Sequence, residues 1–208
     1  MKAEAFFISL QEQLDKQLPF VAYCKPNAYK VLALLQKNNS LFKIDDFLEN
    51  GFVFSPFDSR KDAILIPFAE SKTLRVDTEL IANDEFNEEV LPNTSEKEHY
   101  LNLVSKAIGT INKGTLDKVV LSRTETISNA KLDVFETFKR LINQYNSAFV
   151  YCWYHPKVGL WLGATPETLL KIDEKFISTM SLAGTQEYQG IVDVDYVDIL
   201  SMRSYTWI

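Results

Sequence analysis

The segment SAFVYCWYHP at residues 147–156 is an almost uninterrupted apolar run, and it constrains the fold more than any other part of the chain. Continuous runs rich in aromatic and β-branched residues are typical of strands that are buried on both faces. LWLGA at 160–164 follows after the residues KVG, so the two runs are predicted to pair as an antiparallel hairpin. The sequence therefore predicts a sheet whose hairpin strand is covered on both sides.

Other segments show either the helical or the strand period. A capping-box pattern at Ser95 and Glu98 opens one of the helices, which Lys113-Gly114 closes. Apolar spacing predicts further helices at 3–16 and 131–145, and a short helix that starts at Pro166. Strands are predicted at 19–24, at 51–57 and 62–68 (a hairpin joined by DSRK), at 118–127 and at 175–183. The segment 26–36 fits either a strand or a helix, and 70–94 gives no clear pattern.

The order of these elements indicates the fold class. Strands come in pairs and helices lie between the pairs, so the pattern is a repeated β-β-α unit and not strict β-α alternation. This pattern favours an α+β fold with antiparallel sheets flanked by helices. The chain has 208 residues with no low-complexity segment and no Gly/Ser linker, so we expect no internal domain boundary in this part.

Composition argues against several kinds of partner. The net charge is −6 and no long basic run is present, which argues against nucleic acid as a partner. No window approaches the roughly 18 consecutive apolar residues of a membrane span, and the start is unlike a signal peptide, so we expect a cytoplasmic protein. Cys24 and Cys152 lie in apolar runs and are predicted to be buried free thiols. His99 and His155 form no metal motif.

Three positions carry residues that suit catalysis, although each also has a purely structural explanation. Glu167 follows Thr165-Pro166 at a predicted helix start. Its carboxylate is either there because the helix dipole stabilises a negative charge, or it is kept protonated and acts as a general acid. Lys118 is the first residue of the predicted strand KVVLSR. It is either a solvated lysine or a lysine whose amine is desolvated by the VVL residues, and in the second case the neutral amine would act as a base. Gly184 and Thr185, in SLAGTQ, form either a turn or a cradle of N–H and hydroxyl donors.

The motifs KVVLSR, LGATPE and LAGT occur at 118–123, 162–167 and 182–185. In this order and at these distances they resemble the chorismate-utilising enzymes: isochorismate synthase, salicylate synthase and the large subunits of anthranilate and aminodeoxychorismate synthase. The resemblance covers about residues 95–194, and FVFSPFDSRKDAILIP resembles the N-terminal sheet of isochorismate synthases. It implies an α+β domain of repeated β-β-α units with two orthogonal sheets between helical layers.

The resemblance also implies a reaction. In isochorismate synthases the lysine at the position of Lys118 activates water for attack at C2 of chorismate. The glutamate at the position of Glu167 protonates the departing C4 hydroxyl, and Gly184 and Thr185 correspond to substrate-binding residues. The family further implies Mg²⁺ on the substrate carboxylate.

Two positions discriminate between reactions within the family. Members that use ammonia have glutamine where this chain has Lys118, and aminodeoxychorismate synthases commonly have a lysine near Ala183. The chain is therefore expected to use water, as isochorismate synthase does; salicylate synthase shares the lysine and remains the alternative. The residues do not distinguish menaquinone from siderophore synthesis.

The resemblance ends shortly after LAGTQ. There the family continues into an acidic helix that supplies glutamate to Mg²⁺, and further residues supply a second metal glutamate and an arginine for the substrate. This chain reads YQGIVDVDYVDILSMRSYTWI instead, with no glutamate after Glu187. We therefore expect residues 1–195 to be the N-terminal portion of one chorismate-binding domain, 196–208 to be an aberrant tail, and the Mg²⁺ ligands to be absent, so that the chain is truncated and impaired as an enzyme. A non-catalytic fragment is the alternative to an enzyme.

Overall fold

The structure is a computed structural model that describes residues 1–46, 48–81, 94–124, 133–173, 176–180 and 206–207. The chain divides into two compact units. The first contains Met1–Asn83 and Asp133–Ile208, and the second contains Asp84–Leu132.

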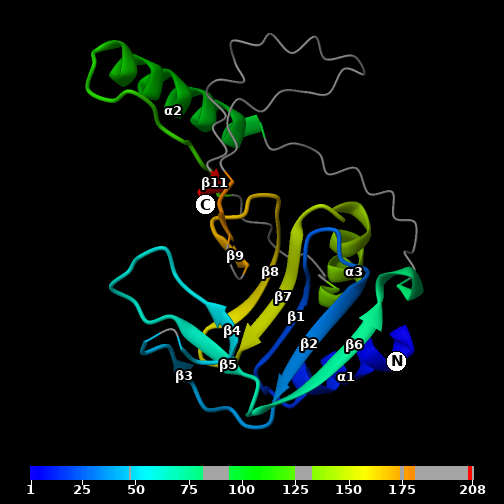
Figure 1. The fold of residues 1–208 in the computed structure, drawn as a ribbon. Helices are drawn as coiled ribbons and strands as arrows, with labels where there is room; N and C mark the ends of the chain where they lie inside the picture. The colour runs from blue at the N-terminus through cyan, green and yellow to red at the C-terminus, as the bar shows by residue number, and fades with distance from the viewer. Residues whose placement is uncertain (47, 82–93, 125–132, 174–175, 181–205, 208) are drawn as a thin grey trace. The chain divides into compact units, whose positions relative to one another are not determined.

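A five-stranded sheet is the centre of the first unit (Figure 1). Its strands are β1 (Phe20–Cys24), β2 (Lys30–Gln36), β6 (Ser71–Asp77), β7 (Phe149–His155) and β8 (Gly159–Thr165), in the order β6-β2-β1-β7-β8. Every neighbouring pair is antiparallel. The predicted hairpin of β7 and β8 is confirmed, with Tyr151 opposite Gly163 and Trp153 opposite Trp161.

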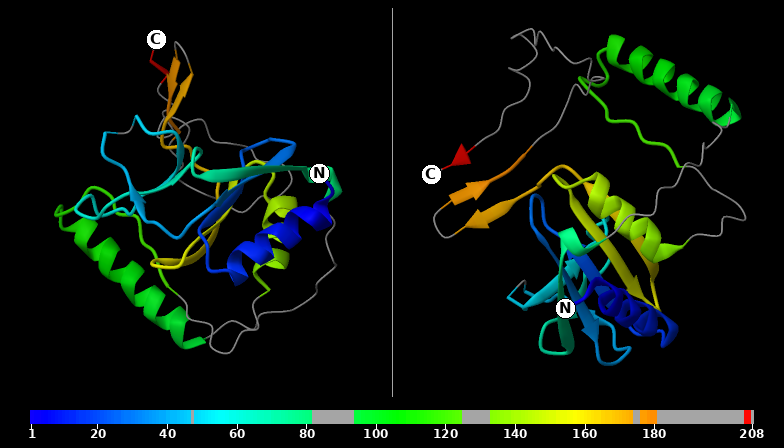
Figure 2. Two further views of the ribbon diagram at one scale, coloured as in Figure 1. Left: turned by 90° about the horizontal axis from the view of Figure 1, so that it is seen from below. Right: turned by 90° about the vertical axis from the view of Figure 1, so that its right-hand side faces the viewer.

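Two helices cover one face of this sheet (Figure 2). Helix α1 (Ala3–Asp15) lies over β1 and β6, and α3 (Val134–Gln144) lies over β7 and β8. Phe6 and Leu10 of α1 and Phe138 of α3 are buried there against alternate residues of the strands, because successive strand residues point to opposite faces. Both helices agree with the periodicity of the sequence.

A small sheet covers the opposite face. Its strands are β3 (Phe42–Lys43), β4 (Gly51–Phe54) and β5 (Ile64–Pro67), in the order β3-β5-β4. The predicted hairpin of β4 and β5 is confirmed. Ile66 of β5 is buried with Val21, Tyr23, Leu34 and Trp153 of the large sheet. Cys152 and Trp153 are both fully buried, one in each core, which confirms that β7 is covered on both faces.

The two outer strands of the large sheet differ in charge. Strand β6 carries the exposed side chains of Lys72, Arg75 and Asp77. Strand β8 has the sequence GLWLGAT and carries no charge. Within the described residues, neither strand has a partner on its outer side.

The remaining elements are short, except for one helix. A 3₁₀ turn, η1, spans Thr78–Leu80, and β9 (Lys171–Asp173), β10 (Phe176–Ser178) and β11 (Thr206–Trp207) form a three-stranded sheet. The second unit contains α2 (Thr94–Asn112), so Ser95 lies inside the first turn and not before it. Gly114 has a φ of +69° and ends α2 as predicted, because its N–H bonds to Ile111 and that of Thr115 to Thr110.

These elements confirm an α+β fold with antiparallel sheets and few helices. Among the described residues, no helix has the length and apolar character that crossing a membrane requires. Cys24 and Cys152 are buried free thiols, as predicted. Burial raises the pKa of Cys152 to about 12 and also raises that of Cys24, so neither thiol ionises readily near neutral pH.

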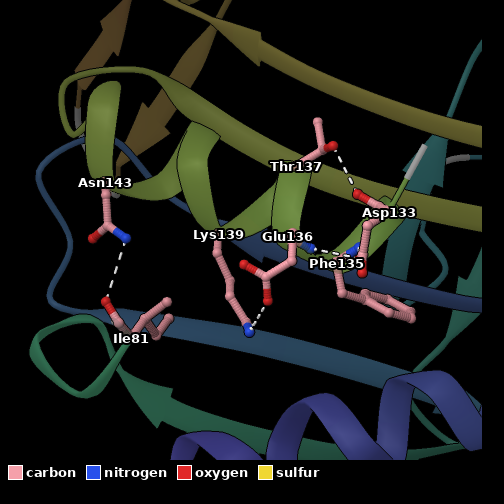
Figure 3. Close-up of polar contacts among 7 residues, drawn as sticks. All are labelled: Ile81, Asp133, Phe135, Glu136, Thr137, Lys139 and Asn143. Atoms are coloured by element: carbon pink, nitrogen blue, oxygen red, sulfur yellow. Dashed lines mark hydrogen bonds and ion pairs between the residues drawn. The ribbon is translucent and has the colours of Figure 1, made fainter. Parts of the chain in front are cut away.

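Asp133 caps the N-terminus of α3 (Figure 3). Its Oδ1 accepts hydrogen bonds from the backbone N–H groups of Phe135 at 3.1 Å and Glu136 at 3.0 Å. Thr137 Oγ1 donates to the Asp133 carbonyl at 2.7 Å. Near the other end of the helix, Asn143 Nδ2 donates to the carbonyl of Ile81 at 3.3 Å, which ties α3 to the chain that follows β6.

The cap gives a stability prediction. Asp133→Ala is expected to lower the free energy of unfolding by about 1 kcal/mol, because two N–H groups of the first turn lose their acceptor. Asp133→Asn keeps an oxygen acceptor and is expected to cost only a fraction of that. Urea unfolding followed by circular dichroism measures both variants, and equal losses would contradict the cap.

A buried polar network surrounds His155 at the end of β7. Gln36 Nε2 donates to the carbonyls of Asn38 and Ser40, each at 2.8 Å, and so fixes the chain that leads from β2 to the small sheet. Lys157 N–H donates to His155 Nδ1 at 3.1 Å, so Nε2 carries the proton toward the Ser40 carbonyl 3.4 Å away. Burial lowers the pKa of His155, as does the nearby Lys157 charge, although the hydrogen bond to Ser40 opposes this.

The lowered pKa of His155 makes stability depend on pH in a defined direction. The unfolded chain takes up this proton near pH 6.5, whereas the folded chain takes it up only at lower pH. The free energy of unfolding is therefore expected to fall as the pH drops below 6.5, by up to about 1.4 kcal/mol per pH unit from this one group. Urea unfolding between pH 5 and 8 measures the slope.

His155→Gln is expected to flatten that slope, and His99→Gln, which changes an exposed histidine of α2, is expected to leave it unchanged. A wild-type slope in the His155→Gln variant would show that other groups cause the pH dependence.

Candidate functional site

Glu167 lies two residues after β8, in a segment that is not helical. The predicted helix from Pro166 is therefore wrong, and Thr165 is the last residue of β8 instead of a helix cap. The backbone carbonyls of this segment accept hydrogen bonds from two residues that follow β10. Met180 N–H donates to the carbonyl of Thr168 at 2.9 Å, and Thr179 Oγ1 donates to that of Leu169. These bonds take the place of the i to i−4 bonds that a helix would form.

The same hydrogen bonds place Glu167 at the base of a hairpin. Strands β9 and β10 pair with Ile172 opposite Ile177 and Lys171 opposite Ser178, and the bonds to Thr179 and Met180 extend this pairing as far as Thr168. The predicted strand at 175–183 is confirmed for 176–178, whereas β9 had not been predicted. Glu167 is exposed and precedes the first residue of the extended pair.

Lys118 belongs to the second unit, six residues after the end of α2. The predicted strand at 118–127 is wrong over 118–124, and the rest of it lies outside the described residues. A strand requires a hydrogen-bonded partner, and no described strand pairs with this segment. The lysine is exposed, and Val119 and Val120, which were expected to bury its amine, are 41% and 91% exposed.

The predicted substrate-binding residues Gly184 and Thr185 lie outside the described residues. The same is true of Ala183. The part of the chain that the structure describes contains no group of three or more His, Cys, Asp or Glu side chains that could hold a metal ion. We therefore assign no Mg²⁺ ligand among the described residues.

A cavity of about 450 Å³ lies between α1 and α3 in the first unit. Phe7 and Phe135 line it with ring centroids 6.4 Å apart, and the Lys139 ammonium lies 4.7 Å above the centre of the Phe7 ring. Lys139 also pairs with Glu136 (Figure 3). Neither Lys118 nor Glu167 lines this cavity. The cavity forms where two helices that are far apart in the sequence pack together, so no sequence motif indicated it.

Comparison with known proteins gives one match. The model of a family described as "Chorismate binding enzyme" matches residues 59–195, about two thirds of the chain. The matched region contains Lys118, Glu167, Gly184 and Thr185. No curated protein and no solved structure gives a significant match. The length of the matched region shows that the chain belongs to the chorismate-binding enzyme family.

Proposed function

We propose that this chain derives from a cytoplasmic isochorismate synthase, which converts chorismate to isochorismate. The observation that carries the proposal is the family match over 59–195, because this region includes the motifs KVVLSR, LGATPE and LAGT in one continuous stretch. Within the family, the water-using reaction is favoured by lysine at position 118 and by alanine at position 183.

In the proposed reaction Lys118 is the base and Glu167 is the acid. The neutral amine of Lys118 takes a proton from water as the water oxygen forms a bond to C2 of the ring. The ring double bonds shift, the C4–O bond breaks, and the carboxyl of Glu167 gives its proton to the departing hydroxyl, which leaves as water. One water enters and one leaves, so the product is an isomer of the substrate.

The hairpin supports a shared site for Glu167 and the LAGT segment. The Met180 N–H donates a hydrogen bond to the Thr168 carbonyl, and Gly184 follows Met180 by four residues in the sequence. Four residues span at most about 14 Å, even when fully extended. Chain connectivity therefore limits how far Gly184 can lie from the segment that carries Glu167, which is compatible with the proposed shared site.

The exposure of both proposed catalytic side chains sets a condition on this mechanism. Lys118 and Glu167 are both exposed. General acid–base catalysis needs each group within hydrogen-bond reach of the proton that it transfers, about 2.6–3.2 Å. The proposal therefore requires bound chorismate to lie within that reach of the Glu167 carboxyl, and the attacking water to lie within that reach of the Lys118 amine. Mg²⁺ is part of the proposal as a family cofactor, without an assigned residue or step.

Catalysis by the 208-residue chain can be tested directly. The purified chain is incubated with chorismate, with and without Mg²⁺, and the products are separated by liquid chromatography. Isochorismate is the expected product. Lys118→Ala and Glu167→Gln are each expected to lower kcat by about 10²–10⁴-fold, because each removes one proton-transfer group.

Two other exposed residues serve as matched controls. Lys113→Ala and Glu98→Gln change the same residue types outside the motifs and are expected to leave kcat unchanged. Salicylate as the product would favour salicylate synthase instead. Absence of turnover together with absence of chorismate binding in calorimetric titration would support a non-catalytic fragment. Equal rates for wild type and both motif variants would refute the assigned roles.

A further inference from the structure

Gly163 of the LGATPE segment lies directly beneath an aromatic ring. Tyr151 is its partner across the β7–β8 pair, and both residues face the small sheet. A Cβ atom built on Gly163 would lie 2.7 Å from Tyr151 Cε1 and 2.8 Å from both Cζ and the phenol oxygen. Real Cβ atoms essentially never approach other atoms so closely, so the outer end of the ring occupies the space of a side chain at position 163.

The need for glycine at this position is a matter of space. Gly163 is not among the described glycines with positive φ, so its backbone is open to any residue. The ring itself has neighbours that restrict it. Its centroid lies 5.9 Å from that of Phe54 on β4 and 6.5 Å from that of Phe149 on β7. A methyl group at position 163 would therefore have to displace a ring that is already packed against others.

The contact lies at the end of β8 that leads to Glu167. Thr165, the last residue of β8, pairs with Phe149, and Glu167 follows two residues later. We propose that Tyr151 is a positioning residue: its ring, seated on Gly163, fixes the end of β8 and thereby the place of the Glu167 carboxyl. This inference rests on the proposed function, because it assigns Tyr151 to the site that contains Glu167.

Gly163→Ala in the full chain is the first test. The added methyl group displaces the ring and with it the end of β8. Because a catalytic group misplaced by about 1 Å can cost on the order of 100-fold in rate, kcat for chorismate is expected to fall by about that factor, with a smaller change in KM. Circular dichroism at the assay temperature establishes that the variant is folded.

The combination with Tyr151 variants separates this mechanism from a general packing defect. Tyr151→Phe keeps the ring and is expected to retain wild-type kcat. Tyr151→Ala removes the ring and is expected to lower kcat. In the Tyr151→Ala background, Gly163→Ala is expected to change kcat by no more than about twofold, because no ring remains to displace. If Gly163→Ala lowers kcat equally in both backgrounds, the proposal is wrong.

A glycine elsewhere in the chain supplies the control. A Cβ on Gly109 of α2 would meet nothing within 4 Å, so Gly109→Ala is expected to leave kcat unchanged. The side-chain carboxyl ¹³C signal of Glu167, assigned by its loss in Glu167→Gln, provides a readout that needs no turnover. It is expected to shift in Gly163→Ala and in Tyr151→Ala but not in Tyr151→Phe or Gly109→Ala.

This signal also separates the two hypotheses. If the wild-type chain neither converts nor binds chorismate, the proposed function fails, and the Glu167 signal alone decides whether Tyr151 positions that carboxyl. A Glu167 signal that is identical in wild type and Gly163→Ala would overturn the inference.

Discussion

The pairing of β1 with β7 is the interaction on which the first unit depends. It joins Phe20–Cys24 to Phe149–His155, two segments that are separated by more than half of the chain. β1 is buried at every residue and β7 at most of its residues, and cores lie on the two faces of the sheet that they form. To form this pairing, the chain must first close a long loop, and the entropy of loop closure is lost before the contacts between the strands are gained. The topology of the sheet therefore constrains the order of folding more than local propensity does.

The sequence predicted the elements that show either a regular helical period or a pair of apolar runs joined by a short turn. α1 and α3 follow from the helical spacing of their apolar residues, and the β4–β5 and β7–β8 hairpins follow from pairs of apolar runs joined by short turns. Two strands of the large sheet were not predicted. β2 is apolar through most of its length because it packs on both faces, so its pattern does not distinguish a strand from a short helix. β6 buries only Leu74 and Val76, so its pattern is mostly that of a polar segment.

The motifs indicated the family, but they did not predict the local backbone around the candidate site. The residues KVVLSR favour a strand, yet a strand forms only where a partner supplies hydrogen bonds. Thr165-Pro166-Glu167 has the residues of a helix start, and in the structure the following residues bond to Thr179 and Met180 instead. The contact between Tyr151 and Gly163 could not be predicted, because it depends on the register of two strands and on which face their side chains share.

The difference in charge between β6 and β8 affects which edge of this sheet can accept a further strand. Charged side chains on an edge oppose the approach of another strand, and β6 presents them along most of its length. β8 presents none. Addition of a strand to this sheet, whether by gene fusion, insertion or a longer homologous chain, is therefore compatible with the β8 side and disfavoured on the β6 side. Of the two outer strands, β8 is the one whose charge pattern leaves its edge open to a further strand.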